Sequence, residues 1–341
     1  MRLRMMSVAF GPATMAEACV GLRRIREVAD CVELRLDLFE EPFDLAVLLR
    51  ERGHLPAVAT LRPPEQGGRC ALPADERLKV LVQAARLGAE YVDLEFDAAT
   101  EAAQAAIRAA GARVIISRHD FSAMPSGLAE TWWPALAAQG ADVVKVVGAA
   151  GDVRDCLQVF RALGHADRPT IAIAMGEAGL ATRILSLRAE QCLLTYAALE
   201  DGSGTAPGQL SVHDMRHMYR AERLGPSTRV YGLLGPHAER ERLAEYNAWF
   251  AADGFDGVAA PFLARAEAAA IVDAFRELPV SGWHVHGAAL QSDVVTVMDA
   301  LDATARRQGK VNAVVRGPGG GLHGHWVESP REQYDLWRSA S

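Results

Sequence analysis

The chain has 341 residues, a length that suggests about two domains. Half of the residues are hydrophobic and 23% are charged, an ordinary globular balance that argues against a disordered protein. The sequence holds 36 Lys and Arg against 43 Asp and Glu, a formal net charge of −7, which argues against a general nucleic-acid binder because such proteins need a basic face.

The sequence lacks the signals of membrane insertion and of disulfide formation. It contains no run of about 18 apolar residues, so we expect no membrane span and no membrane partner. The five cysteines lie far apart and outside any Cys-x-x-Cys pattern, which gives little support to a disulfide framework or to structural zinc. We therefore expect a reduced, cytoplasmic location.

Eight short apolar runs alternate with amphipathic stretches in the first 220 or so residues. The runs lie at residues 7–11, 31–37, 56–62, 91–96, 113–119, 143–148, 169–176 and 194–199. This alternation predicts a parallel α/β sheet, and eight units of this length fit a closed (β/α)8 TIM barrel. An open doubly wound sheet is the alternative, but GPATMAE (11–17) lacks the glycine fingerprint typical of that fold.

Helix-like stretches lie between the runs, and a last one follows them. They include residues 15–30, 74–88, 152–164 and 211–224. The last stretch begins with Ser211 and Asp214, whose spacing resembles a capping box.

A second, smaller α/β pattern follows LGPST (224–228), which predicts a linker. We expect a barrel domain over residues 1–224, a linker over 225–228 and a second domain over 229–341. Strands are expected at 230–235, 257–262 and 283–287, with helices near 239–254, 264–279 and 294–309. The glycine-rich PGGG (318–321) lies within 312–326 and predicts a hairpin turn rather than a phosphate loop.

Charged residues interrupt strands whose inner face in a barrel is normally apolar. Glu33, Arg35 and Asp37 alternate with two leucines, so the three charges share one face and point to the barrel axis. A structural ion-pair network and a ligand site both explain such a set, because burying unpaired charge is costly. Clustering of charges in a cleft favours the ligand site.

Three further residues lie in or at the carboxyl ends of strands, where barrel enzymes build their active sites: Arg62, His119 and Lys145. Lys145 interrupts a run of valines, and burial there disfavours its ammonium form. A neutral amine attacks carbonyls and forms a Schiff base, and His119 can move protons beside the resulting iminium. The alternative is a lysine that reaches the rim and pairs with Glu33.

The later loops carry groups suited to an anionic, oxygen-rich ligand. Arg183 follows MGEAG (175–179), and TAPGQ (205–209) supplies the Thr205 hydroxyl and the Gln209 amide near a helix start. An ordinary turn with a helix cap is the alternative interpretation of TAPGQ.

Taken together, these motifs resemble type I 3-dehydroquinate dehydratase over residues 7–222. The shared motifs follow the family's order: ELRLDL (33–38), TLRPPEQGG (60–68), SRHDF (117–121) followed by Pro125, DVVKV (142–146), MGEAGLATR (175–183) and TAPGQ (205–209). The resemblance implies a hydro-lyase of the shikimate pathway of aromatic amino-acid biosynthesis. Its reaction is the syn elimination of water from 3-dehydroquinate through a lysine imine, which gives 3-dehydroshikimate. Neither a cofactor nor a metal is implied, and we expect a homodimer.

The resemblance also implies a role for each matching residue. Lys145 would form the imine with the substrate ketone, His119 would remove the neighbouring proton, and Arg183 would hold the carboxylate. The remaining residues would bind hydroxyls, set the local charge or close over the ligand: Glu33, Arg35, Arg62, Thr205 and Gln209. Two positions differ from the family pattern, because an accessory Gln66 replaces a usual glutamate and Thr205 replaces a frequent serine.

Residues 229–326 resemble the substrate-binding domain of shikimate dehydrogenase in a degenerate form. The motifs that carry this likeness are VYGLLG (230–235), Asn247-x-x-Phe250, GFDGVAAPF (254–262) and GKVNAVV (309–315). Leu290 takes the place of the family's catalytic lysine, and Glu328 that of its catalytic aspartate. We therefore expect no dehydrogenase activity from this domain.

Several other uses of the second domain remain open. It can serve as a dimerisation or docking module, or as a support for the barrel. Arg240 and Arg242 can capture an acidic metabolite. Two pairs of alternating histidines can each chelate a metal ion: His284 with His286, and His323 with His325.

Two other functions remain open for the whole chain. One is another class I lysine-imine barrel enzyme of the aldolase type. The other is a non-catalytic metabolite-binding or scaffold protein with decayed sites.

Overall fold

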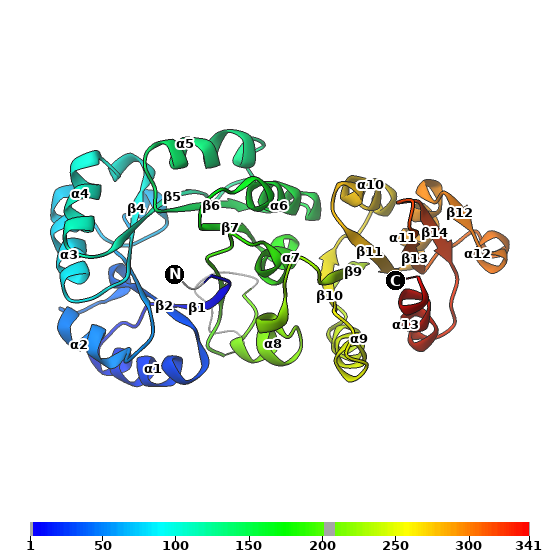
Figure 1. The fold of residues 1–341 in the computed structure, drawn as a ribbon, viewed down its shortest axis with the longest axis horizontal. Helices are drawn as coiled ribbons and strands as arrows, with labels where there is room; N and C mark the ends of the chain where they lie inside the picture. Colours follow the sequence, from blue (N-terminus) through cyan, green and yellow to red (C-terminus); the bar gives the residue numbers. More distant parts are fainter. Residues whose placement is uncertain (1–2, 201–208, 341) are drawn as a thin grey trace.

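The molecule consists of two α/β domains that lie side by side along its longest axis (Figure 1). The computed structural model describes residues 3–200 and 209–340. The first domain contains an eight-stranded sheet, and the second contains a six-stranded sheet with the order β10-β9-β11-β13-β14-β12.

All eight predicted barrel strands form. They are β1 (Met5–Phe10), β2 (Cys31–Arg35), β3 (Ala57–Thr60), β4 (Tyr91–Glu95), β5 (Arg113–Asp120), β6 (Val143–Ala149), β7 (Thr170–Met175) and β8 (Leu194–Ala197). Each ladder between neighbours is parallel, in the order β7-β6-β5-β4-β3-β2-β1-β8. A bridge between Thr170 and Cys192 joins the two ends of this order. The predicted TIM barrel is therefore confirmed, with one seam that is loosely paired.

Helices follow the strands and surround the sheet (Figure 1). They are α1 (Met15–Val28), α2 (Leu45–Glu51), α3 (Ala74–Arg86), α4 (Glu101–Ala109), α5 (Trp133–Ala138), α6 (Cys156–His165), α7 (Leu180–Leu185) and α8 (Val212–His217). Strand alternation explains the packing, because the outward Leu34 joins the large apolar core that includes Leu22 and Leu48 of the helices. The inward Glu33 and Arg35 line the cavity of the barrel instead.

The second domain begins as predicted with strand, helix and strand. Its strands are β9 (Arg229–Gly235), β10 (Gly257–Leu263), β11 (Val280–Val285), β12 (Ala300–Leu301), β13 (Ala313–Arg316) and β14 (Leu322–His325). Its helices are α9 (Arg240–Ala252), α10 (Ala268–Ala274), α11 (Ala288–Asp293), α12 (Ala303–Gln308) and α13 (Pro330–Ser339). Strands β9, β10 and β11 are parallel, and β13 and β14 form the antiparallel hairpin predicted around PGGG.

One predicted helix of the second domain is wrong. Residues 294–309 form a short 3-10 helix, the strand β12 and the helix α12 instead of one continuous helix. The cause is Asp302, whose side chain accepts a hydrogen bond of 2.6 Å from the Ala305 amide and caps α12. An aspartate in an N-cap geometry marks the beginning of a helix, so no continuous helix extends through Asp302.

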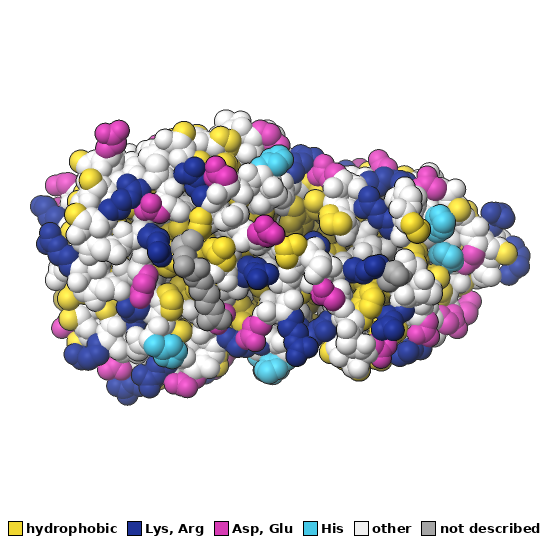
Figure 2. All heavy atoms as spheres, in the orientation of Figure 1, with side chains coloured by type: hydrophobic (Ala, Val, Ile, Leu, Met, Phe, Trp, Pro, Cys, Tyr) yellow, Lys and Arg dark blue, Asp and Glu magenta, His cyan; other side chains and the backbone are white. Residues whose placement is uncertain are grey.

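Charged contacts and apolar packing both join the two domains. Arg161 pairs with Glu277 at 2.9 Å, and Arg154 pairs with Glu267 at 2.6 Å. The expected linker is anchored to the barrel, because Arg188 donates hydrogen bonds to the carbonyl oxygens of residues 226 and 228 at 3.1 and 2.8 Å. The face drawn in Figure 2 carries positive and negative side chains interspersed over both domains.

The predicted capping box at the start of α8 forms only in part. The Ser211 hydroxyl accepts a hydrogen bond of 3.2 Å from the Asp214 amide, which is the expected cap. The carboxylate of Asp214 instead binds Arg240 of the second domain, with one N–O distance of 2.6 Å. No helix within the described residues has the length and apolar character needed to cross a bilayer.

Candidate active site

A cavity of about 140 Å³ lies at the carboxyl ends of the barrel strands. It brings together eight residues that the sequence singled out: Glu33, Arg35, Arg62, Gln66, His119, Lys145, Arg183 and Gln209. Thr205 lies outside the described residues. Residues from six separate segments thus converge where a barrel enzyme is expected to work.

Lys145 lies at the centre of this group on β6. Its side chain is 5% exposed, and its Nζ atom lies 2.9 Å from Asp93 Oδ2 and 3.3 Å from Glu33 Oε1. The Tyr196 hydroxyl lies 3.1 Å from the same nitrogen. Aliphatic side chains such as Val147 and Ile173 do line the cavity, but the amine itself contacts carboxylates, because the valines on either side of Lys145 in the chain face the helices. The alternative interpretation, a pairing of Lys145 with Glu33, thus forms in the interior and not at the rim.

Asp93 and Tyr196 contact the Lys145 amine, and the sequence analysis did not single them out. Asp93 lies on β4 between Tyr91 and Glu95, and all three share the inward face. The alternation rule that singled out Glu33 and Arg35 applies equally to this strand, so the signal for Asp93 was present in the sequence. Tyr196 gave no such signal, because an aromatic residue in an apolar run is typical of a core.

The two carboxylates beside Lys145 are held in their charged form. Burial alone would raise the pKa of Asp93, but Arg62 and Lys145 lower it well below its usual value. The same balance lowers the pKa of Glu33, with Lys145 as the main opposing charge. Hydroxyl groups support both carboxylates, because Ser117 donates to Asp93 at 2.6 Å and Thr60 donates to Glu33 at 2.7 Å.

Arg62 positions this network from β3's carboxyl end. Its guanidinium donates to Asp93 at 2.7 Å, to Ser117 at 2.8 Å and to Glu95 at 3.3 Å. Burial would lower the pKa of Arg62, but Asp93 and Glu95 raise it, so the cation is firmly maintained. These contacts favour a role in holding Asp93 over the predicted contact with substrate hydroxyls.

His119 lies at the end of β5 beside the lysine. Its ring stacks on Phe121 with centroids 5.6 Å apart, and its Nδ1 atom is buried without a hydrogen bond to any described residue. Burial, together with the nearby charges of Arg62 and Lys145, holds the pKa of His119 well below its usual value. The imidazole is therefore neutral at neutral pH and able to accept a proton.

Gln66 faces the same cavity, whereas Glu65 beside it is exposed. The Oε1 atom of Gln66 is buried and makes no hydrogen bond to the described residues. Gln66 and His119 therefore line one cavity.

Arg183 supplies positive charge on the side of α7. It is 2% exposed, and burial lowers its pKa to about 10. Arg35, on β2, is paired with Asp37 through two hydrogen bonds of 2.9 and 2.8 Å. Both guanidinium groups line the cavity and supply positive charge to it.

Comparison with known proteins decides the family. The family described as type I 3-dehydroquinase matches residues 8–226, which is more than half of the sequence. The chain belongs to the type I 3-dehydroquinase family. Members of this family are hydro-lyases, and the predicted resemblance of the barrel is confirmed.

Curated relatives extend the likeness. A 3-dehydroquinate dehydratase from Desulfotalea psychrophila is 32% identical over 231 residues, covering 64% of this chain and 98% of the relative. The bifunctional 3-dehydroquinate dehydratase/shikimate dehydrogenase of Arabidopsis thaliana is 31% identical over 302 residues, covering 84% of this chain. The chain spans about half of that bifunctional protein, 48% of its length. The C-terminal region accordingly resembles the N-terminal domain of shikimate dehydrogenase.

Solved structures share the fold. The 3-dehydroquinate dehydratase from Geobacillus kaustophilus matches with a TM-score of 0.57 and 22% identity, covering 63% of this chain and 93% of that one. The dehydroquinate dehydratase and shikimate dehydrogenase structure from S. pombe matches with a TM-score of 0.54 and 23% identity, covering 95% of this chain and 64% of that one. The second match spans both domains.

Proposed function

We propose that this protein is a 3-dehydroquinate dehydratase in which Lys145 forms a Schiff base with the substrate. The observation that carries the proposal is the buried amine of Lys145, which shares one cavity with His119 and Arg183 in a chain of this family. We also propose that the barrel domain spans residues 1–224 and the second domain residues 229–341, with a linker at residues 225–228.

The reaction follows from the groups in the cavity. The ammonium group of Lys145 passes a proton to a neighbouring carboxylate, and the free amine adds to the C3 ketone. Return of that proton with loss of water gives an iminium. The iminium draws electrons from the C2–H bond, and His119 accepts that proton. The resulting enamine expels the C1 hydroxyl, which takes a proton from His119 and leaves as water. Hydrolysis of the imine then releases 3-dehydroshikimate and restores Lys145.

The carboxylates around Lys145 would stabilise the positive charge of the iminium in this series of reaction steps. Asp93 and Glu33 lie against the nitrogen that bears the positive charge of the iminium. Fixed negative charges at that point stabilise the charge without further rearrangement of the protein. Arg183 would orient the substrate by binding its carboxylate, which places the ketone toward Lys145.

Chemical trapping tests the proposal. The sequence contains three lysines: Lys79, Lys145 and Lys310. Borohydride added in the presence of 3-dehydroquinate should reduce the imine, and peptide mass spectrometry should place the adduct on Lys145 alone. Lys145→Ala should lose the adduct and the absorbance rise of the conjugated product, whereas Lys79→Ala, on the exposed face of α3, should keep both.

The rival functions give different results in the same experiment. An adduct on Lys145 without formation of 3-dehydroshikimate would favour another lysine-imine enzyme of the aldolase type. The absence of both adduct and product would overturn the catalytic proposal in favour of a metabolite-binding or scaffold protein.

For the second domain, we propose that it does not act as a dehydrogenase. Leu290, at the position expected for the catalytic lysine, is 2% exposed and belongs to the apolar core. Glu328, at the position expected for the catalytic aspartate, accepts a hydrogen bond of 3.0 Å from the Trp326 indole. Assays with shikimate and NADP, or with 3-dehydroshikimate and NADPH, should show no turnover by the purified chain.

Binding of an acidic metabolite to the second domain and formation of a homodimer stay predictions. The guanidinium of Arg240 binds Asp214, and that of Arg242 binds Glu245, so an acidic metabolite would have to compete with both carboxylates. Calorimetry with the pathway acids tests this binding. Light scattering coupled to size exclusion tests the expected homodimer.

A further inference from the structure

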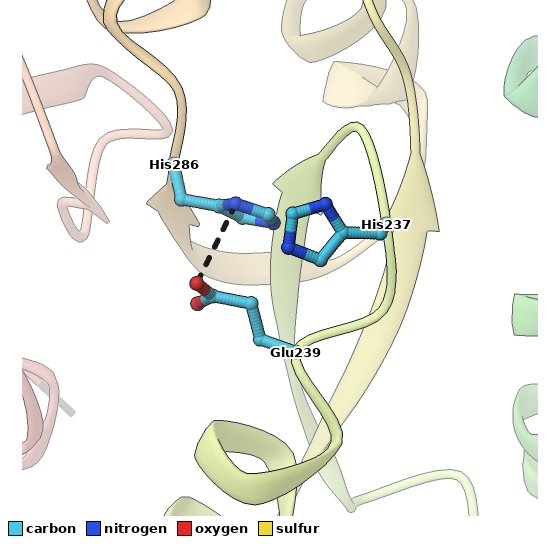
Figure 3. A group of neighbouring side chains, drawn as sticks. All are labelled: His237, Glu239 and His286. Carbon is cyan, nitrogen blue, oxygen red and sulfur yellow. Dashed lines mark ion pairs between the residues drawn. The ribbon is translucent and has the colours of Figure 1, made fainter.

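Three potential metal ligands meet at the carboxyl ends of strands β9 and β11 in the second domain, outside the dehydratase cavity. His237 and Glu239 lie in the loop between β9 and α9, and His286 directly follows β11 (Figure 3). One ligand atom of each residue lies within 4.8 Å of the others. The carboxyl ends of parallel strands thus bring two imidazoles and a carboxylate to one point.

The group is partly sheltered and oriented. The side chain of His286 is 12% exposed, and its Nδ1 atom lies 3.6 Å from Glu239 Oε1. The ring of His237 approaches that of His286 edge-on, with centroids 5.1 Å apart. The other ring nitrogen of His286, Nε2, is buried and makes no hydrogen bond to any described residue. A buried imidazole nitrogen without such a partner is available to a ligand.

The backbone beneath His286 is shaped to accept its ring. A Cβ atom added to Gly235 would lie 1.7 Å from His286 Nε2, so any larger residue at this position would push the ring away. Glycine at the end of β9 therefore allows the close approach of β11's histidine to the loop that carries the other two residues.

The chemistry of this set suits a transition metal. Imidazole nitrogen with carboxylate oxygen is a common ligand set for zinc, and bonds of about 2.0–2.2 Å place tetrahedral ligands roughly 3.3–3.6 Å apart. A bound ion would draw the three ligand atoms together from their present separation of up to 4.8 Å. Three protein ligands leave a fourth position for water or another molecule.

We propose that His237, Glu239 and His286 bind a divalent transition-metal ion, with zinc as the best match to their chemistry. This site is separate from the cavity of the proposed dehydratase reaction, whose proposed steps use no metal. It modifies the histidine-pair hypothesis, because His286 draws its partners from the β9–α9 loop and not from its strand neighbour.

The other histidines considered from the sequence have different partners. The Nδ1 atom of His284 lies 3.2 Å from the Tyr246 hydroxyl and 3.1 Å from Gln333 Oε1. His325, on β14, lies 3.2 Å from Asp302, and β13 separates β14 from β11, so the second predicted pair does not join the group.

Metal analysis of the full, tag-free chain tests the proposal. After incubation with Zn²⁺ and dialysis, elemental analysis should find about one zinc per chain. Titration with Co²⁺ should give the visible absorption of a low-symmetry site. His286→Ala should weaken binding roughly tenfold or more, whereas His323→Ala, a histidine on β14 outside the group, should bind as the unmodified chain does.

The dehydratase assay and circular dichroism check that each variant folds correctly. Glu239→Gln preserves shape and lies in a loop, so it gives the same test if His286→Ala does not fold. Sub-stoichiometric zinc in the unmodified chain would overturn the proposal. Zinc binding that survives both substitutions, or that falls equally in His323→Ala, would overturn it as well.

Discussion

The carboxylate of Asp93 lies 2.9 Å from the amine of Lys145, deep inside the barrel. The same carboxylate accepts a hydrogen bond of 2.7 Å from Arg62. Asp93 therefore lies between two buried cations that have lost their hydration and would otherwise repel each other. Glu33 beside Lys145 and Glu95 beside Arg62 supply further negative charge, but Asp93 is the carboxylate that both cations share.

Replacement of Asp93 by asparagine should destabilise the barrel. The substitution keeps the shape of the side chain but leaves Arg62 and Lys145 with one fewer buried carboxylate, at a cost of about 3–5 kcal/mol. Denaturant unfolding measures the change. Asp97→Asn, at an exposed position in the short 3-10 helix after β4, is the matched control and should alter stability by less than about 0.5 kcal/mol. An Asp93 variant as stable as the control would contradict this account of the network.

Substitution of Gln66 by glutamate should move the pH dependence of the enzyme. A carboxylate in the cavity favours the imidazolium, so it should raise the pKa of His119 from its depressed value. The imidazole is then protonated at a higher pH, so the pH at which kcat/KM falls on the acidic side of its profile should rise. Glu65→Gln changes an exposed neighbour and should leave the profile in place. An unshifted limb in the Gln66 variant would show that this position does not act on the histidine.

His119→Ala should separate imine formation from proton transfer. Lys145 keeps its position and its carboxylate partners, so borohydride should still trap the substrate. Removal of a general base should slow turnover by roughly 10²–10⁴-fold. Single-turnover kinetics with trapping at each time point measures both steps. Loss of the adduct together with the rate would assign His119 to imine formation instead.

The main features of the barrel were accessible from sequence because strand alternation is a strict rule. Eight apolar runs predicted eight strands, and charges two residues apart on β2 predicted inward-facing groups. The same rule, applied to Tyr91, Asp93 and Glu95, would have added the missing carboxylate. The valines beside Lys145 in the chain do not reveal Asp93, because chain neighbours on a strand face opposite sides of the sheet.

Contacts between distant segments were not accessible in the same way. The pairing of Asp214 with Arg240 depends on how the two domains lie against each other, and local spacing favoured a helix cap. The grouping of His237 with His286 likewise depends on β9 and β11 being neighbours in the sheet. Alternation finds residues on one strand, whereas sheet order decides which loops meet.

Arg183→Lys should weaken substrate binding more than it slows chemistry. A guanidinium binds a carboxylate through two parallel hydrogen bonds, and an ammonium group cannot reproduce that geometry. Loss of one charged hydrogen bond corresponds to about 1.5–3 kcal/mol, or roughly 10–100-fold in KM. Steady-state kinetics measures the effect, and Arg188→Lys, which lies at the domain junction, is the control. A fall in kcat with unchanged KM would place Arg183 in the chemical step.

The contact between α8 and α9 gives a prediction about domain docking. Asp214 is 3% exposed, so removal of its partner in Arg240→Ala leaves a buried carboxylate without its ion pair. The cost should be about 1–3 kcal/mol, seen as a lower midpoint of thermal unfolding and as faster proteolysis between the domains. Arg242→Ala, which removes a pair with Glu245 within one helix, should have a much smaller effect. Equal effects of the two substitutions would show that the ion pair does not hold the domains together.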